Sequence, residues 1–328
     1  MHTTRMGSER YGMLMFKDVL ALIEAYDTII IHRHSRPDGD AMGSQIGLKH
    51  LIVENYPHKT VYLVGDEAKH FGFLPDSVMD VIPDDTYTGA LAILLDSAAP
   101  HLISDDRYTL AAQTARMDHH IYCETFTDVE VVDTSYESCC GMVTDFAVQS
   151  GWRINATAAL ALYTGMVTDS GRFRYDGTTA RTFRLAAALM ETDFDTNDLF
   201  RNLYADNLEG KQLKAQFTLK IQRTETAVAY IYTTLEEFNA LGLDTFTVSR
   251  GMVNTMGDIK GVDIWVNFTE TDDGVLCEIR SNRYNINPVA VKYGGGGHQK
   301  ASGATVPDRA TAMAMLEDLK TIAQGGIV

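Results

Sequence analysis

The chain has 328 residues, of which 45% are hydrophobic and 22% are charged. This is the composition of a globular protein rather than a disordered or fibrous one, and at roughly 150 residues per domain it predicts about two domains. The 28 basic and 44 acidic side chains give a formal net charge of −16. Such a charge argues against a broad basic face that wraps long nucleic acid, so a polyanionic partner must be short or be met by metal ions.

The sequence contains neither an evident membrane span nor a secretory signal. Its best apolar run, residues 156–167, is shorter than the roughly 20 residues that cross a bilayer. Residues 1–12 contain arginines but no apolar segment after them. The four cysteines form no CxxC pair, which fits a reducing compartment. We therefore expect a cytoplasmic protein without a membrane partner, and we leave open whether it forms a homodimer.

The first part of the chain alternates apolar runs typical of strands with segments of helical periodicity. Three aliphatic runs predict buried strands at residues 28–31, 61–64 and 91–95. Between the first two, apolar residues from 42 to 52 recur at helical intervals. Further elements follow in order: a strand at 129–132 and helices at 141–148, 156–167 and 178–190. Strands that alternate with helices predict an α/β fold with a parallel sheet covered on both faces.

A change in composition divides the chain. Residues 191–214 are polar and charged and predict a linker between a first domain, 1–190, and a second domain, 215–328. The second domain has its own alternation, with strands at 228–232, 264–268 and 275–279 and helices at 235–241 and 310–323. We therefore predict a second, smaller α/β domain.

The segment HSRPDGD follows the first predicted strand and carries an imidazole and two carboxylates, on His34, Asp38 and Asp40. Ligands of open parallel sheets bind beyond the carboxyl ends of the strands, where this segment lies. Pro37 and Gly39 favour a tight turn that would bring the three groups together, with Asp40 also placed to cap the next helix. These groups suit Mn²⁺, Mg²⁺ or Zn²⁺. Taken alone, the segment is equally compatible with a turn whose acids are solvated.

Three further segments carry carboxylate or imidazole groups where an apolar stretch ends. Asp96 directly follows the third predicted strand, His119 and His120 follow Asp118, and Asp169 ends the helix predicted at 156–167. Taken singly, these residues are explained by a helix cap, a surface loop and a capped helix end. Adjacent histidines on an extended chain point to opposite sides, so at most one of the two should face the same site as Asp96.

Four such segments in succession predict a site for two divalent cations. One cation would be held by His34, Asp38 and a shared Asp96, and the other by Asp40, the same Asp96, one of the adjacent histidines and Asp169. A bridging carboxylate suits ions roughly 3.5–4 Å apart, and two such ions activate water for attack on phosphorus.

The motifs HSRPDGD, LLDS, DHH and TDSGRFRY, in this order, resemble motifs one to four of the DHH phosphoesterase superfamily. The segment IRS followed by YGGGGHQKASGA resembles the associated C-terminal domain. Over nearly its whole length the chain is similar to the nanoRNase and pAp-phosphatase branch, bifunctional oligoribonucleases that also remove phosphate from 3′-phosphoadenosine 5′-phosphate (pAp). The resemblance implies that 1–190 is a parallel-sheet DHH domain that binds metal and that 215–328 is a substrate-binding domain.

The resemblance also implies roles for individual residues. The implied metal ligands are His34, Asp38, Asp40, Asp96, His119 and Asp169, and it is the resemblance that selects His119 over His120. Among the catalytic residues it implies, Asp96 is the metal bridge, Asp118 supports the ligands from behind, and His120 faces the phosphate.

The glycine run Gly294–Gly297 is the second candidate site, because glycine allows backbone amides to approach an anion closely. It matches neither the dinucleotide fingerprint nor the phosphate-loop motif. Arg280 leaves a predicted strand where its guanidinium could clamp a phosphate. Without the resemblance, a flexible loop beside a surface arginine explains these residues. The resemblance implies a substrate site that includes Arg280, Ser281, Gly295, Gly296, Gly297 and His298. Arg172 is a further candidate, although Arg172 and Arg174 could instead pair with the acids.

The resulting prediction is a metal-dependent phosphoric ester hydrolase of exonuclease type. It would cleave short single-stranded oligonucleotides, dinucleotides such as pApA, or the nucleoside bisphosphate pAp, and no long duplex. Mixed imidazole and carboxylate ligation favours Mn²⁺. Two alternatives stay open: a manganese-dependent pyrophosphatase or polyphosphatase, which would be indifferent to Arg280, and a nucleotide sensor that binds without cleaving. The sequence does not specify the preferred substrate or the cleavage polarity.

Overall fold

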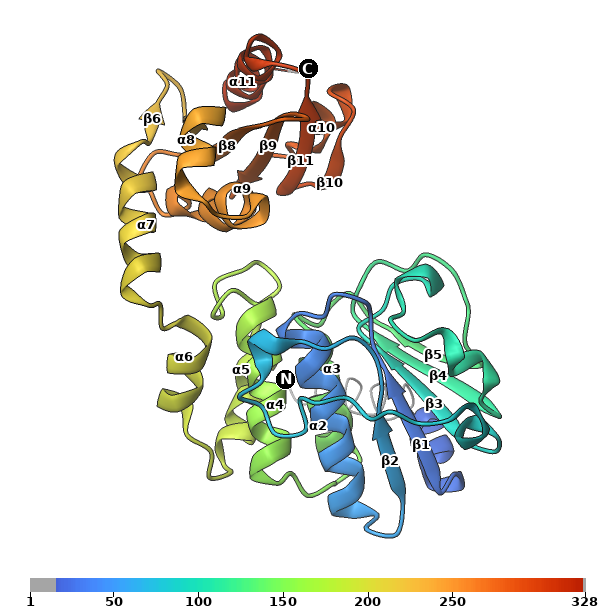
Figure 1. Cartoon of the computed structure of the whole chain (residues 1–328). Coiled ribbons are helices and arrows are strands. Elements are labelled where there is room, and N and C mark those ends of the chain that lie inside the picture. Colours follow the sequence, from blue (N-terminus) through green and yellow to red (C-terminus); the bar gives the residue numbers. More distant parts are fainter. Residues whose placement is uncertain (1–15, 327–328) are drawn as a thin grey trace, which may run out of the picture. The chain divides into compact units, whose positions relative to one another are not determined.

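The computed structural model describes residues 16–326, so residues 1–12, which we interpreted as containing no secretory signal, lie outside the described part. The chain divides into two compact units, Met1–Ala205 and Asp206–Val328, whose helices and strands are shown in Figure 1. No helix in the described range is long and apolar enough to cross a membrane. The predicted α/β fold with a second, smaller α/β domain is confirmed.

A parallel sheet of five strands forms the centre of the first unit, in the order β2–β1–β3–β4–β5. The strands are β1 (Thr28–His32), β2 (Thr60–Leu63), β3 (Leu91–Leu95), β4 (Gln113–Asp118) and β5 (Val129–Val132). The aliphatic strands β1 and β3 are almost wholly buried, as expected for the centre of a parallel sheet. The register pairs Ile31 with Ile93 and Leu95 with Met117. Residues just beyond the ends of β1, β3 and β4 therefore emerge at one edge of the sheet.

The helices of the first unit include two that approach each other closely. They are α2 (Gly39–Asn55), α3 (Cys139–Gln149), α4 (Ala156–Asp169), α5 (Ala180–Met190) and α6 (Thr196–Tyr204), preceded by helical residues 16–25. On α2, Gly39, Gly43 and Gly47 lie four residues apart and face α4. A Cβ at Gly43 would lie 2.4 Å from the carbonyl oxygen of Ala161, so only glycine permits this spacing of the two helices.

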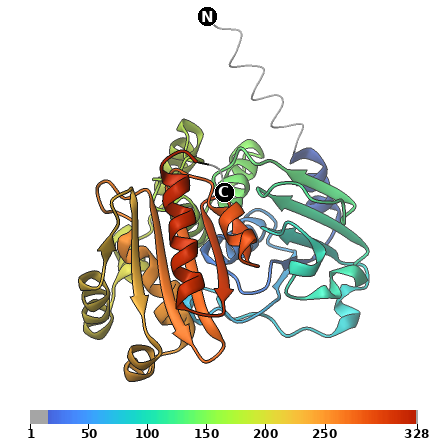
Figure 2. The same ribbon diagram turned by 90° about the horizontal axis from the view of Figure 1, so that it is seen from above.

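The second unit contains a sheet of six strands in the order β10–β11–β9–β8–β7–β6, in which only the β7–β8 pair is parallel. Its strands are β6 (Gln222–Arg223), β7 (Val228–Thr233), β8 (Ile264–Thr271), β9 (Gly274–Ser281), β10 (Gly296–His298) and β11 (Ala301–Val306). Its helices are α7 (Leu208–Leu219), α8 (Leu235–Leu241), α9 (Thr245–Val253), α10 (Asn287–Lys292) and α11 (Arg309–Ala323). Figure 2 shows α11 lying across one face of this sheet.

Two separate cores cover the two faces of the second sheet. Side chains of α10 and α11, such as Val289 and Met315, pack with Val266 and Ile279 on one face. Side chains of α7 and α9, such as Phe217, pack on the other. The second unit thus has its own hydrophobic interior.

The polar segment predicted as a linker, residues 191–214, is helical over much of its length. It contains α6 and the first part of α7, which are capped by the side chains of Asp195 and Asn207. The two units divide inside this segment, between Ala205 and Asp206. The polar composition arises because both helices are largely exposed, with Leu199 the buried residue of α6.

Candidate metal site and substrate face

His34 and Asp38 lie where the chain passes from β1 into α2. Asp38 is the N-cap of α2, and its Oδ1 accepts hydrogen bonds from the amides of Asp40 and Ala41, both at 3.0 Å. Our expectation that Asp40 caps this helix is therefore wrong. Asp40 lies two residues further on and is only 1% exposed, so its carboxylate faces the interior.

Asp40 is held by the start of another helix. Its two carboxylate oxygens accept hydrogen bonds from the amides of Cys139 and Cys140, at 2.6 and 2.8 Å. These are the first amides of α3, and a helix N-terminus favours negative charge. The Nε2 atom of His119 lies 3.6 Å from Oδ2 of Asp40. The carboxylate is thus fixed by backbone and keeps lone pairs for a cation.

Asp96 is the carboxylate that the other groups share. It is 2% exposed, and its oxygens lie 3.4 Å from Nε2 of His34, 3.5 Å from Nε2 of His119 and 3.5 Å from Nδ1 of His120. Its backbone has φ 52°, which is uncommon for a residue other than glycine. Its buried Oδ1 has no hydrogen-bond partner among the described residues. A buried carboxylate oxygen without a donor fits a metal ligand, since it is otherwise unfavourable.

Both adjacent histidines reach Asp96, contrary to our expectation that at most one would. The strand β4 ends at Asp118, so the alternation of an extended chain no longer applies to His119 and His120. Their rings lie 4.6 Å apart. Asp118, which is buried, accepts a hydrogen bond of 2.8 Å from Nδ1 of His120. Asp118 therefore orients His120 from behind.

Two of the imidazoles have one ring nitrogen occupied by the protein. Nδ1 of His34 lies 2.8 Å from the carbonyl oxygen of Ser35, and Nδ1 of His119 lies 3.4 Å from that of Tyr136. A carbonyl can only accept, so Nδ1 is the donor in both rings and Nε2 is directed to the site. Nε2 of His119 also lies 3.5 Å from Oδ2 of Asp169 at the end of α4.

The predicted ligands form overlapping groups that could hold metal ions. In each group the candidate ligand atoms lie within 4.8 Å of one another: His34, Asp38 and Asp96; Asp40, His119 and Asp169; Asp96, His119 and His120. Carboxylate oxygens and imidazole nitrogens are the donors that Mn²⁺, Mg²⁺ and Zn²⁺ accept. The residues present therefore fit divalent metal, although the individual ligand assignments stay predictions.

The carboxylates of this cluster differ in pKa. Burial and the neighbouring charge of Asp96 raise the pKa of Asp40 well above its ordinary value. Burial also raises the pKa of Asp169, to about 6. Burial acts in the same direction on Asp96, but the neighbouring imidazoles of His119 and His34 outweigh it and hold its pKa below the ordinary value. Asp96 is therefore the carboxylate that stays ionised most readily.

The imidazoles carry protons when no metal is bound. Burial alone would lower the pKa of His34 and His119, but hydrogen bonds and charges of the neighbouring carboxylates raise both to about 10. The hydrogen bond to Asp118 raises the pKa of His120. The positive charge of the protonated rings offsets the negative charge of the carboxylates. A divalent cation would displace the protons from the nitrogens that ligate it.

Two buried arginines beside the cluster were missed from the sequence. Arg33 precedes His34, and Arg116 precedes Asp118 by two residues; both are 0% exposed. Arg33 donates to Oε1 of Gln45 at 2.8 Å and to the carbonyl oxygen of Asp66. The signal that could have revealed them is an arginine near the end of a buried strand, one to three residues before a candidate ligand.

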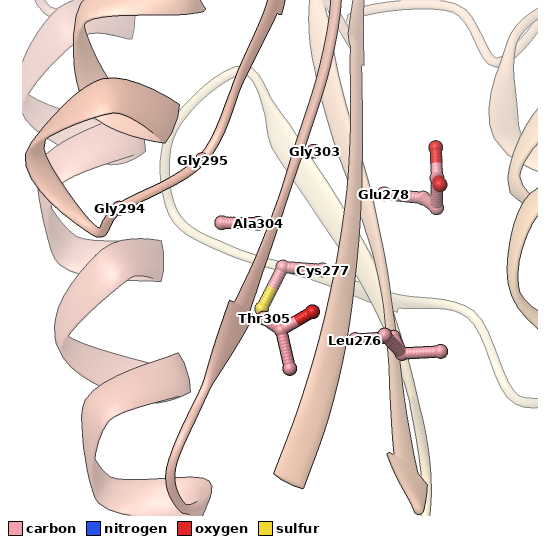
Figure 3. Close-up of a pocket in the computed structure, with 8 residues that line it drawn as sticks. All are labelled: Leu276, Cys277, Glu278, Gly294, Gly295, Gly303, Ala304 and Thr305. Atoms are coloured by element: carbon pink, nitrogen blue, oxygen red, sulfur yellow. The ribbon is translucent and has the colours of Figure 1, made fainter. Parts of the chain in front are cut away.

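Three of the predicted substrate residues of the second unit, Arg280, Gly296 and His298, share one face of its sheet. Arg280 of β9 pairs with Ala301 of β11, which in turn pairs with His298 of β10. In the same way, Glu278 of β9 pairs with Gly303 of β11, which pairs with Gly296 of β10. Nη2 of Arg280 forms an ion pair with Oε2 of Glu278 at 3.0 Å. A hollow of about 390 Å³ lies beside these residues, lined by Leu276, Cys277, Glu278, Gly294, Gly295, Gly303, Ala304 and Thr305 (Figure 3).

The glycines of the run are required for different reasons. A Cβ at Gly295 would lie 2.0 Å from the carbonyl oxygen of Gly303, and Gly297 has φ 129°. At Gly296, a Cβ would meet nothing within 4 Å. Among these three glycines, Gly296 is therefore the one at which a side chain would fit without a clash and without an unfavourable φ.

Ser281 and Arg172 each contact another part of their own unit, and their predicted roles in substrate binding stay predictions. The Ser281 hydroxyl donates to the carbonyl oxygen of Asp263 at 3.0 Å and accepts from the amide of Tyr284 at 2.7 Å. It thus holds the turn after β9. The guanidinium of Arg172 lies 4.7 Å from the ring centroid of Tyr204, in a cation–π arrangement.

A parallel α/β sheet with Asp and His side chains gathered beyond its strand ends, followed by a mixed sheet with a glycine-rich edge, is a two-domain architecture that suits a metal-dependent hydrolase. The chain belongs to the DHH family. Residues 28–166 match the DHH family N-terminal domain, and residues 244–325 match the DHHA1 domain.

Relatives match nearly the whole chain. It is 36% identical to the bifunctional oligoribonuclease and PAP phosphatase NrnA of Bacillus subtilis, over 94% of this chain and 98% of that protein. It is 37% identical to a probable bifunctional oligoribonuclease and PAP phosphatase NrnA of Streptococcus mutans, over 94% and 99%. A crystal structure of an exopolyphosphatase-related protein from Bacteroides fragilis has a TM-score of 0.83 at 23% identity, with 95% and 97% covered, and shows the same fold.

Proposed function

We propose that this protein is a two-metal phosphoesterase that hydrolyses short oligonucleotides and dinucleotides such as pApA to mononucleotides, and pAp to AMP. The observation that carries the proposal is the position of Asp96, within 3.4–3.5 Å of nitrogens of three histidines and shared between candidate metal groups. The names of relatives with 36–37% identity support the same substrates. They do not favour a pyrophosphatase or a sensor.

The metal ligands in this proposal are His34, Asp38, Asp40, Asp96, His119 and Asp169. Two divalent ions, when bound, activate water and offset the charge that develops on the phosphoryl group. Mn²⁺ is the proposed metal because the donors mix imidazole and carboxylate. Nε2 of His34 and of His119 is available because Nδ1 of each ring donates to a backbone carbonyl.

His120 is the proposed proton donor to a phosphoryl or leaving oxygen. Its Nδ1–H is occupied by Asp118 at 2.8 Å, so Nε2 is the atom that can face substrate. The carboxylate of Asp118 raises the pKa of the ring, which favours the protonated form that a donor requires. His120 is also the most exposed of the three histidines, with 42% of its side chain accessible.

The second unit is the proposed substrate-binding domain. Arg280, Gly296 and His298 lie on one sheet face, where a guanidinium, a backbone free of side chain and an imidazole can meet phosphate and base. The net charge of −16 would repel long polyanions, which favours short substrates. A cytoplasmic location accords with such substrates.

The test is to incubate the full chain with Mn²⁺ and pAp, pApA, RNA oligomers of increasing length and polyphosphate, and to compare kcat/KM. We expect cleavage of pAp or the shortest oligonucleotides and none of polyphosphate. Asp96→Asn, which removes the shared charge at constant shape, should lower kcat by more than about 100-fold. Asp80→Asn is the control, because the carboxylate of Asp80 accepts a hydrogen bond from the amide of Leu63 and belongs to none of the candidate metal groups among the described residues. Full activity of Asp96→Asn would contradict the two-metal proposal.

A further inference from the structure

Arg116 is a buried cation that joins the loops carrying the candidate metal ligands. It lies on β4 with 0% exposure, two residues before Asp118. We propose that Arg116 is a positioning residue that holds Asp96 and the loop after His120 in the geometry that metal binding requires. The inference rests on the proposed metal ligation, and it concerns a residue that touches neither metal nor substrate.

The first loop that Arg116 holds is the one that follows Asp96. Its Nη1 donates to the carbonyl oxygen of Ala98 at 3.2 Å and, more weakly, to that of Ser97 at 3.5 Å. These are the two residues directly after Asp96. The guanidinium therefore fixes the direction in which the chain leaves β3.

This contact matters because the backbone of Asp96 is strained. A φ of 52° is unfavourable for a residue with a Cβ and persists only where the surroundings hold it. On one side the amide of Asp96 donates to the carbonyl oxygen of Met117 at 3.2 Å. On the other side the carbonyls of Ser97 and Ala98 are held by Arg116. Without these bonds the chain would relax, and the shared carboxylate would turn away from the histidines.

The second loop that Arg116 holds follows His119 and His120. Its Nη2 donates to the carbonyl oxygen of Glu124 at 3.4 Å, and the guanidinium lies 4.5 Å from the ring centroid of Phe126. Nη2 also pairs with Oε2 of Glu130 at 3.2 Å. The other oxygen of Glu130 accepts from the amide of Phe126 at 2.9 Å. This pair of a buried arginine and a partly buried glutamate thus ties the loop to β4 and β5.

An arginine suits this position better than a lysine. A planar guanidinium directs several N–H groups in fixed directions and can reach carbonyls of two loops at once. A buried cation is unfavourable unless it is paired, and Glu130 supplies the opposite charge. Arg116→Lys keeps the positive charge but loses the planar set of N–H donors, so it tests the geometry of the hydrogen bonds rather than the charge.

The matched control is Arg107→Lys. Arg107 also pairs with a carboxylate, that of Asp105, donates to a carbonyl, that of Ile82, and lies over an aromatic ring, that of Tyr87. Its hydrogen bonds join residues 82–84 to residue 105 and do not involve the carbonyls of Ser97, Ala98 and Glu124 that Arg116 holds. It therefore reports the general effect of losing an arginine network in the same unit.

The experiment measures Mn²⁺ binding to the full chain by calorimetry, together with kcat, KM and Tm. We expect Arg116→Lys to raise the Kd for Mn²⁺ by 10- to 100-fold, as loss of partners outside the ligand shell does. We expect kcat at low Mn²⁺ to fall and to recover when Mn²⁺ is raised, with KM for pApA little changed. Arg107→Lys should lower Tm without changing the Kd for Mn²⁺.

An unchanged Kd for Mn²⁺ in Arg116→Lys, with lowered Tm only, would show a merely structural role and overturn the inference. If Arg116→Lys does not fold, Glu130→Gln, which removes the paired charge, should weaken Mn²⁺ binding in the same way. An unchanged Kd in that variant would equally overturn it. Asp96→Asn separates the two proposals, because normal Mn²⁺ binding by that variant contradicts the ligand assignment itself.

Discussion

Each histidine of the metal cluster uses one ring nitrogen for the protein. In His34 and His119 the Nδ1 atom faces a backbone carbonyl, whereas in His120 it faces the carboxylate of Asp118. The carboxylate of Asp118 raises the pKa of the His120 ring, and His120 is also the most exposed of the three rings. These differences separate two rings suited to hold metal from one suited to give a proton.

Metal binding should release protons at neutral pH. The pKa of His34 and of His119 is raised to about 10 without metal, so both rings are protonated at pH 7. A ligand nitrogen must lose its proton, so protons leave as Mn²⁺ binds, and affinity rises with pH up to about pH 10. Calorimetric titration at pH 7 in buffers of different ionisation enthalpy measures this release. Equal heats in all buffers would contradict it.

Substituting single glycines of the run should separate substrate contact from folding. Gly296→Ala meets no atom within 4 Å, so we expect unchanged or slightly raised Tm and a higher KM for pApA if substrate approaches this backbone. Gly295→Ala places a Cβ 2.0 Å from the carbonyl of Gly303 and should lower Tm. Thermal unfolding and steady-state kinetics distinguish the two. An unchanged KM in Gly296→Ala would place the substrate elsewhere.

At the scale of elements, the site depends on how closely α2, α3 and α4 meet. The N-terminus of α3 holds Asp40 on α2, and the glycines of α2 bring it against α4, which ends at Asp169. Gly165 on α4 likewise leaves room for Asp40, since a Cβ there would lie 2.8 Å from its Oδ1. Small residues between the helices thus bring together Asp40 and Asp169, two candidate ligands of the same metal group.

Gly43→Ala should therefore affect both stability and metal binding. Its Cβ would lie 2.4 Å from the backbone of Ala161, and such overpacking typically costs about 1–3 kcal/mol. Because α2 and α4 would move apart, we also expect a higher Kd for Mn²⁺. Gly251→Ala is the control, because a Cβ there meets only the carbonyl of Phe246 at 3.6 Å and should stabilise α9. Unfolding in denaturant and Mn²⁺ titration provide the two measurements.

At the scale of the whole molecule, charge links metal binding to stability. The chain carries a net charge of −16, and acids meet in the interior of the first unit, where burial first and then repulsion by Asp96 raise the pKa of Asp40. Divalent cations would remove part of the repulsion and favour the folded state.

Removal of metal should accordingly lower the melting temperature. A ligand that binds only the folded state adds about 2.7 kcal/mol when present at 100 times its Kd. We expect Mn²⁺ to raise Tm in proportion to the logarithm of its concentration, and a chelator to reverse the shift. Asp96→Asn should abolish most of the effect. A Tm independent of Mn²⁺ in the unchanged protein would contradict a metal site in the folded state.

Much of the fold and of the site could be predicted because it depends on neighbours along the chain. An apolar run that stops at a charged residue indicates a buried strand and a polar strand end, as at Leu91–Leu95 and Asp96. The order of such segments, together with the motifs, was sufficient to predict the α/β class and which side chains gather at the cluster.

Other features could not be predicted, because they depend on contacts between distant segments. The amide of Cys139 meets Asp40 across 99 residues, and that contact, rather than helix capping, explains why Asp40 is buried. Strand β4 contains polar residues and a buried arginine, so its hydrophobic pattern is weak, and its end at Asp118 lets both histidines reach Asp96. Burial and the pairing of charges are properties of the folded chain, and they alone assign Arg116 its place between the two loops.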